Sequence, residues 1–225
     1  MKPLTAILFD LDGTLIDSRE DITASVNEVR GLCELPAYSV EAVSKMVGLG
    51  IRVLLGKALG ENSSLPMDEA VAKFREHYEE HCLDRTRLYD GVEQTLDALS
   101  AYSMGVVSNK PERFCRMILD GLGVAGRFGV ILGGDSTSEK KPHPEPVYKA
   151  MISLGAKPPG VILVGDSPVD VTAGRQAGVR TCAVTYGLVE KEALREAGPN
   201  HLIDSITELP ALIAGVYGEA EGSLR

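Results

Sequence analysis

Short apolar segments rich in β-branched residues alternate with longer amphipathic segments along most of this chain. In the short segments hydrophobic residues follow one another directly, which is typical of strands in a sheet covered on both faces. The longer segments carry apolar residues at helical spacing. The alternation predicts a doubly wound α/β fold, a parallel sheet with helices on both sides. The predicted strands are residues 4–9, 105–107, 130–132, 161–164, 180–184 and 201–203, and the predicted helices include residues 92–100, 111–121, 146–154 and 168–177.

One long stretch, from residue 16 to residue 87, contains helical patterns and no convincing strand. Ser18 and Asp21 fit a capping box that opens a helix ending near Cys33. Further helices are expected at residues 39–47, 51–59 and 67–82.

This interruption predicts two domains. Residues 1–16 and 88–225 would form the α/β core, and residues 17–87 would form an all-helical domain inserted after the first strand. Both connections leave the core at the carboxyl edge of the sheet, so we expect the insert to lie over that edge.

Charge and cysteine usage exclude several classes of protein. The net charge of −9 argues against a general nucleic-acid binder and against docking on anionic membranes, because both need clustered Lys and Arg. The four cysteines lie far apart, as in a cytoplasmic protein with reduced thiols. The apolar run at residues 4–9 is too short for a signal peptide or a membrane span. The oligomeric state stays open.

Polar residues follow several of the predicted strands. Asp10 and Asp12 follow the first strand, Ser108 follows the strand at residues 105–107, and Asp166 follows the strand at residues 161–164. In open parallel sheets, ligands bind outside the carboxyl ends of the strands. Residues two apart in extended chain point the same way, so the first two aspartates should face one crevice.

Lys141 and Asp170 are also candidates for this crevice. Pro142 biases Lys141 toward an extended conformation, from which it could stabilise two carboxylates and hold an anion. Each residue has a structural alternative as well: an ordinary turn for the aspartates, a helix cap for Ser108, a solvated loop for the lysine, and a capping box with Ser167 for Asp170. Their common position at one sheet edge favours a site.

These residues resemble four ordered motifs of the haloacid dehalogenase superfamily, and the helical insert resembles the cap of that family. The residues that carry the resemblance are Asp10-Leu11-Asp12-Gly13-Thr14-Leu15 with Asp17-Ser18, then Ser108-Asn109, Lys141-Pro142, and Gly165-Asp166-Ser167 with Asp170. A weaker match, Met46-Val47-Gly48-Leu49-Gly50 with Leu54-Leu55 and Ala58-Leu59, is similar to the phosphoglycolate phosphatase branch.

The resemblance implies a Mg²⁺-dependent phosphatase with an aspartyl-phosphate intermediate. Asp10 would be the nucleophile, and Asp12 would protonate the leaving oxygen and later activate water. The implied ligands of Mg²⁺ are Asp10, Asp166 and the backbone carbonyl of Asp12. Ser108 and Lys141 would contact phosphate oxygens, with Asn109 on the substrate side and Asp170 in support.

The substrate implied by this branch is a small phosphate monoester, and 2-phosphoglycolate is favoured. Gly48, Gly50 and Arg52 would recognise its carboxylate at the start of a helix, where free N–H groups favour anions. An ordinary helix–helix turn with an exposed arginine is the alternative. Pyrophosphate, sugar phosphates and nucleoside monophosphates are alternative substrates, and a non-catalytic phosphate-binding regulator is a more distant possibility. His77 and His81 also match a zinc-peptidase pattern, H-x-x-E-H, but the same helix carries the charges of a solvated face.

Overall fold

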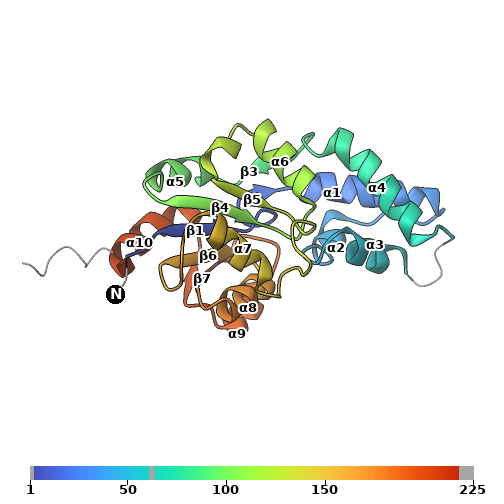
Figure 1. Ribbon diagram of the computed structural model, residues 1–225. Coiled ribbons are helices and arrows are strands. Elements are labelled where there is room, and N and C mark those ends of the chain that lie inside the picture. The colour runs from blue at the N-terminus through green and yellow to red at the C-terminus, as the bar shows by residue number, and fades with distance from the viewer. Residues whose placement is uncertain (1–2, 61–63, 218–225) are drawn as a thin grey trace, which may run out of the picture.

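The molecule is organised around a six-stranded sheet, which the computed structural model places at its centre (Figure 1). The structure describes residues 3–60 and 64–217, so residues 1–2 and 218–225 of the predicted core and residues 61–63 of the predicted insert lie outside the described residues. Every pairing in the sheet is parallel, and the predicted doubly wound architecture is confirmed. In spatial order the strands are β5 (Val130–Leu132), β4 (Ser103–Val107), β1 (Ala6–Phe9), β6 (Val161–Gly165), β7 (Arg180–Val184) and β8 (His201–Ile203).

Helices cover both faces of the sheet, and the side chains of β1 show how. Ala6 and Leu8 belong to one apolar cluster, whereas Ile7 and Phe9 belong to another on the opposite face. The first face packs against α7 (Glu145–Ser153) and α8 (Pro168–Gln176), and the second against α5 (Val92–Ala98), α6 (Glu112–Gly121) and α10 (Leu209–Tyr217). The remaining elements of the core are α9 (Lys191–Ala197) and the short 3₁₀ helices η1 (Ala125–Arg127) and η2 (Ile206–Glu208).

Four helices occupy the stretch that sequence analysis assigned to the insert. They lie together at one end of the molecule (Figure 1). Residues on them, including Ile22, Leu54 and Phe74, join the apolar cluster that contains Ile7 and Phe9, so the insert is packed onto the core. The helices are α1 (Arg19–Leu32), α2 (Val40–Ser44), α3 (Ile51–Leu59) and α4 (Met67–His81).

The two connections of the insert pair with each other. β2 (Ile16–Asp17) and β3 (Arg87–Leu88) form a two-stranded antiparallel sheet, with Asp17 opposite Arg87. The expectation of no strand at these positions was wrong, because two residues are too few to show the periodicity that identifies a strand. The pairing brings the entry and the exit of the insert to one place.

The predicted capping box at the start of α1 was also wrong. Ser18 is the N-cap residue but makes no capping hydrogen bond, and its hydroxyl instead donates to Asp12 Oδ1 at 2.5 Å. Asp21 is buried and accepts hydrogen bonds from the backbone N–H groups of Arg85 and Thr86 and from the Thr86 hydroxyl. Both side chains therefore connect separate parts of the fold instead of closing a helix end.

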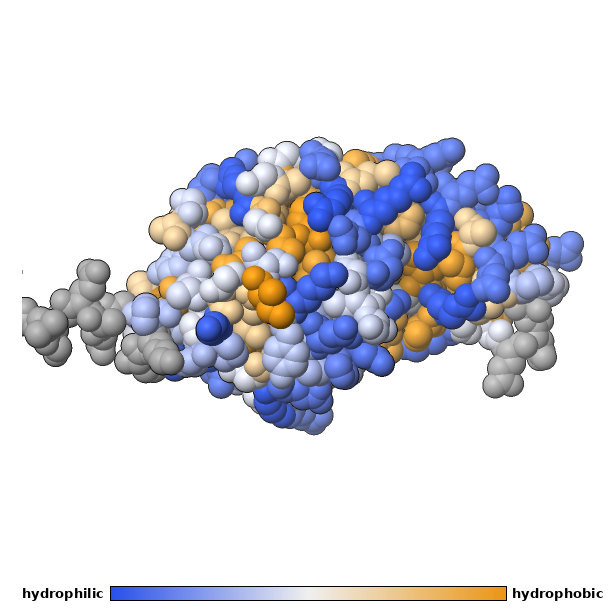
Figure 2. Space-filling view, in the orientation of Figure 1, coloured by the Kyte–Doolittle hydropathy of each residue, from blue (hydrophilic) through white to orange (hydrophobic). Residues whose placement is uncertain are grey.

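The visible surface is mostly hydrophilic, with hydrophobic residues in separate areas (Figure 2). Isolated apolar side chains of this kind are normal on a protein surface. Within residues 3–60 and 64–217, the structure contains no helix that is long and apolar enough to span a bilayer.

Candidate active site

The two central strands place Asp10 and Asp166 side by side. β1 and β6 pair in parallel with Phe9 opposite Val164, and the Asp10 N–H donates to the Val164 carbonyl at 2.8 Å. Chain connections leave β1 and β6 toward opposite edges of the sheet, which makes this the switch point where open α/β sheets bind ligands. The predicted convergence of these two carboxylates is therefore present.

Lys141 reaches the same point from the loop before α7. Its ammonium lies 2.9 Å from Asp10 Oδ1 and 2.6 Å from Asp170 Oδ1. Asp10 Oδ1 also accepts the Leu11 N–H at 2.7 Å, so this carboxylate is held in one orientation. Burial raises the pKa of Asp10 to about 6, although Lys141 opposes the effect. Burial lowers the pKa of Lys141, but its two carboxylate neighbours outweigh this and keep it charged.

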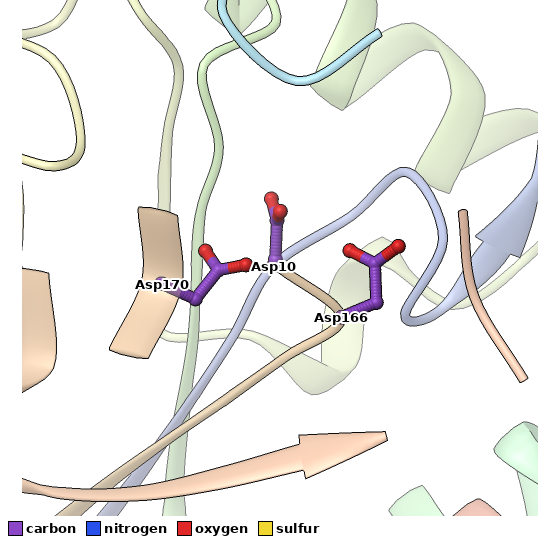
Figure 3. A group of neighbouring side chains, drawn as sticks. All are labelled: Asp10, Asp166 and Asp170. Carbon is purple, nitrogen blue, oxygen red and sulfur yellow. The ribbon is translucent and has the colours of Figure 1, made fainter. Parts of the chain in front are cut away.

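Asp10, Asp166 and Asp170 form a compact acidic group, with ligand atoms within 4.8 Å of one another. Figure 3 shows Asp10 between the other two. Burial, reinforced by the charges of its two neighbours, raises the pKa of Asp166 well above its usual range. Three carboxylates beside the single ammonium of Lys141 leave an excess of negative charge that a hard divalent cation would neutralise.

The hydrogen bonds around this group distinguish two ligand candidates from a supporting residue. Both oxygens of Asp170 are engaged, Oδ1 by Lys141 and Oδ2 by the N–H and hydroxyl of Ser167. At Asp10, the hydrogen bonds that the structure describes are made to Oδ1. At Asp166, the described hydrogen bond is made to Oδ2, which accepts the Leu188 N–H at 2.6 Å. The donor set therefore fits Mg²⁺ through Asp10 and Asp166, with Asp170 holding Lys141.

Two glycines make room for Asp166. A Cβ on Gly13 would lie 2.1 Å from Asp166 Oδ2, and a Cβ on Gly187 would lie 2.3 Å from the Asp166 Cβ. Gly13 belongs to the first motif selected in the sequence, whereas Gly187 and the N–H of Leu188 were missed. They lie in the loop between β7 and α9, and neither residue has a side chain that could signal a site in the sequence.

Asp12 is paired with a lysine that sequence analysis did not select. The Lys110 ammonium lies 2.6 Å from Asp12 Oδ1, the oxygen that also accepts the Ser18 hydroxyl. Lys110 is buried, which lowers its pKa, but the Asp12 carboxylate more than compensates and keeps the ammonium charged. The Asp12 side chain thus turns away from the acidic group, and a ligand role of its backbone carbonyl stays a prediction.

Ser108 and Asn109 follow β4 as expected and both are buried. Ser108 lies at the cavity beside Asp10. The Asn109 side chain donates to the Gly48 carbonyl at 2.9 Å and to the Lys141 carbonyl at 2.8 Å, and accepts the Lys141 N–H at 3.0 Å. Asn109 therefore joins a loop of the insert to the loop that carries Lys141.

A cavity of about 60 Å³ lies between the core and the insert. Gly48 and Gly50 line it, as predicted for the loop before α3. Arg52 does not line it: its guanidinium pairs with Asp68 on the exposed side of the insert. The described lining residues are Asp10, Asp12, Ile22, Val47, Gly48, Gly50, Ile51, Leu54, Phe74, Tyr78, Ser108, Asn109, Lys110, Pro111, Phe114, Asp166, Ser167, Leu188 and Val189.

The two histidines of the H-x-x-E-H pattern make other contacts. His77 Nδ1 lies 2.9 Å from the Ser25 hydroxyl, and His81 Nδ1 lies 2.9 Å from Asp84. Within the described ranges, the group with metal-binding geometry is the acidic one at the sheet edge.

This fold and this ordered set of carboxylates, hydroxyl and lysine define a class of enzyme. The chain belongs to the haloacid dehalogenase-like hydrolases, whose family model matches residues 7–184.

Relatives within the family carry phosphatase names. The chain is 40% identical over 189 residues to a phosphoglycolate phosphatase of Aquifex aeolicus, covering 83% of this chain and 87% of the relative. It is 38% identical over 192 residues to an N-acetylmuramic acid 6-phosphate phosphatase of Pseudomonas aeruginosa, covering 84% and 85%. A crystal structure of a predicted phosphoglycolate phosphatase from Haemophilus somnus matches with a TM-score of 0.88 at 32% identity, covering 94% of this chain and 99% of that one.

Proposed function

We propose that this enzyme is a Mg²⁺-dependent phosphatase that hydrolyses 2-phosphoglycolate or a similarly small phosphate monoester. The observation that carries the proposal is the geometry at the ends of β1 and β6. There Asp10 is held by Lys141, stands beside Asp166, and opens onto a small cavity that Asp12 and Ser108 also line. Phosphate monoesters need up to about 10²¹-fold acceleration, which no single group supplies.

The reaction would begin with attack of an Asp10 carboxylate oxygen on phosphorus. The bond between phosphorus and the ester oxygen breaks, Asp12 gives a proton to the leaving oxygen, and an aspartyl phosphate remains on Asp10. Asp12 then accepts a proton from a water molecule that attacks phosphorus. The bond between phosphorus and the Asp10 oxygen breaks, so phosphate leaves and the Asp10 carboxylate is regenerated. The hydrogen bonds to Asp10 Oδ1 support this role because they fix the carboxylate before the substrate arrives.

The other groups would bind the phosphoryl oxygens and balance charge. The Ser108 hydroxyl and the Lys141 ammonium are the donors for these oxygens. Asp10 and Asp166 would hold Mg²⁺, which when bound offsets the repulsion between a phosphate dianion and carboxylates. Asp170 would keep Lys141 in place through their ion pair.

The helical insert would act as a cap over the reaction. Residues 17–87 would form this cap, and residues 1–16 and 88–225 would form the catalytic core. The contact of Asn109 with the Gly48 carbonyl supports a closed position, in which water is excluded from the cavity.

The size of the cavity favours a short substrate. A space of about 60 Å³, walled on the insert side by Ile22, Leu54 and Phe74, favours a small phosphate ester over a large one. The phosphoglycolate phosphatase relative supports 2-phosphoglycolate. The relative that acts on N-acetylmuramic acid 6-phosphate makes a sugar phosphate the second candidate.

The experiment compares turnover of 2-phosphoglycolate, N-acetylmuramic acid 6-phosphate, pyrophosphate and a nucleoside monophosphate, with Mg²⁺ and with EDTA. We expect the highest kcat/KM for 2-phosphoglycolate and none in EDTA. Asp10→Asn should lower kcat by at least about 10⁴-fold while circular dichroism shows a folded protein. Asp120→Asn, on the exposed side of α6, is the matched control. Near-normal turnover by Asp10→Asn would overturn the mechanism.

A further inference from the structure

The cavity has a marked asymmetry of charge. Among the described residues that line it, Lys110 is the only cation. The side chains from the insert are apolar with one exception, Tyr78. Lys110 is therefore the cation in this lining that a second anionic group of the substrate could contact, and it lies on the core; the Lys140 ammonium lies near Gly50 but is not among the lining residues.

Lys110 lies next to the position where the ester bond would break. Its ammonium is 2.6 Å from Asp12 Oδ1, and Asp12 is the proposed donor to the leaving oxygen. The leaving oxygen would thus be connected to the Lys110 ammonium through two hydrogen bonds, one between the leaving oxygen and Asp12 and one between Asp12 and Lys110. This is within reach of a charged group attached one or two bonds beyond that oxygen, such as the carboxylate of a short hydroxy acid.

Tyr78 provides the second observation. The residue is 1% exposed, and within the described part of the chain its buried hydroxyl makes no hydrogen bond of good geometry, while the Lys110 ammonium is the charge that acts on it most strongly. The ring is fixed by stacking on Phe74 and by an edge contact with Phe114, and its centroid lies 5.0 Å from the Lys110 ammonium. A buried hydroxyl without a partner is costly, and a bound acceptor would remove that cost.

We infer that Lys110 and Tyr78 together form the binding position for a carboxylate on the leaving group of the substrate. The inference rests on the proposed phosphatase function and names the residues that select its substrate. It replaces Arg52, which the structure places outside the cavity, with a core lysine and a cap tyrosine. Polar leaving groups without a charge are disfavoured, because they leave the ammonium directed at Asp12 alone.

The test uses two substrates of nearly equal size, 2-phosphoglycolate and its amide, 2-phosphoglycolamide. The wild-type enzyme should prefer the carboxylate by about 100-fold in kcat/KM, as expected for a buried charge pair. Lys110→Met should reduce this preference to within about threefold, because the methionine keeps the volume and removes the charge. Tyr78→Phe should lower kcat/KM for 2-phosphoglycolate by about tenfold and change the amide little. The control is Lys57→Met, an exposed lysine on α3, which should keep the full preference.

The outcomes separate this inference from the proposed function. If the wild-type enzyme hydrolyses neither compound nor any of the other phosphate esters named above, the proposed function fails; if it hydrolyses only the others, the carboxylate position is wrong. If it hydrolyses both equally well, or if both variants keep the preference, the phosphatase stands and the carboxylate position is wrong. An equal loss on both substrates in Lys110→Met would mean that the lysine only orients Asp12, and it would overturn the assignment of Lys110 to carboxylate binding. Because Tyr78→Phe removes a hydroxyl without a partner, its thermal stability should be unchanged or higher.

Discussion

At the scale of single residues, the chemistry of this site depends on its charge balance, because the carboxylates outnumber the lysines that pair with them. Lys141 is shared by Asp10 and Asp170, and Lys110 serves Asp12. Asp166 accepts the backbone N–H of Leu188, and burial together with two like charges raises its pKa. The uncompensated charge is therefore concentrated where a metal ion would bind.

This charge predicts how pH and Mg²⁺ act together on stability. The pKa of Asp10 is about 6 in the folded protein and near 4 in the unfolded chain, so between these values the folded state holds more protons. The contribution of this group to the free energy of unfolding is then present below pH 4 and lost as pH rises through 6. Mg²⁺ needs the deprotonated carboxylates, so its stabilising effect should be small at pH 5 and reach its maximum above about pH 7.

The measurement is the increase in Tm on adding Mg²⁺ to EDTA-treated protein across this pH range. Asp166→Asn should reduce the increase at every pH, whereas Asp120→Asn should leave it unchanged. An increase in Tm that is independent of pH, or equal in both variants, would place the ion elsewhere.

The acidic residues that directly follow strands are the part of the site that can be predicted from the sequence. Lys110 and Arg52 show which residues cannot be placed in this way. A carboxylate directly after a buried strand lies at the carboxyl edge of the sheet, so the positions of Asp10 and Asp166 at that edge could be predicted. Lys110 follows Ser108-Asn109, where its direction depends on Asp12, 98 residues earlier. Arg52 lies in the first turn of α3, and because Leu54 and Leu55 take the inner face, the arginine is turned outward.

At the scale of elements, Asp21 fastens the first helix of the insert to the chain that returns to the core. The carboxylate of this α1 residue accepts the N–H groups of Arg85 and Thr86 and the Thr86 hydroxyl, at 2.7 to 3.1 Å. Hydrogen bonds to a buried charge are stronger than neutral ones, and unpaired N–H groups would remain if it were removed.

Asp21→Ala should therefore lower the free energy of unfolding by about 3 kcal/mol. The measurement is urea denaturation. Glu20→Ala is the matched control, because Glu20 is the neighbouring acid and is 54% exposed, so it should change the value by less than about 0.5 kcal/mol. Equal effects of the two substitutions would show that Asp21 is not a structural tie.

The elements themselves were largely predictable, and the exceptions share a cause. The strands at residues 130–132, 180–184 and 201–203 lie where sequence analysis placed them. The capping box at Ser167 and Asp170 is also present, alongside the contact with Lys141. Local patterns carry this information. β2 and β3 exist only because distant segments pair with each other, and no local pattern encodes such a pairing.

At the scale of the whole molecule, a second contact joins the insert to the core. Arg113 on α6 forms an ion pair with Glu79 on α4, next to the edge contact between Phe114 and Tyr78. The ion pair is exposed, so it contributes at most about 1 kcal/mol. Because it bridges two parts of the chain, that energy acts on closure of the insert as well as on folding.

Arg113→Ala should therefore raise KM by up to about fivefold and change the free energy of unfolding by less than about 1 kcal/mol. Arg116→Ala provides the control, because Arg116 pairs with Glu112 in the same helix and should leave KM unchanged. Adding about 1 M salt should bring the wild-type KM close to that of Arg113→Ala. If KM changes neither with the substitution nor with salt, this ion pair does not contribute to closure of the insert.

The pairing of β2 with β3 has a wider consequence. The polypeptide leaves the sheet and returns to it through two adjacent segments, so residues 18–86 form an insertion whose two ends lie next to each other. The strands that deliver Asp10 and Asp166 are not interrupted by it. Evolution can therefore exchange or resize this stretch of chain while the residues at the ends of β1 and β6 keep their places.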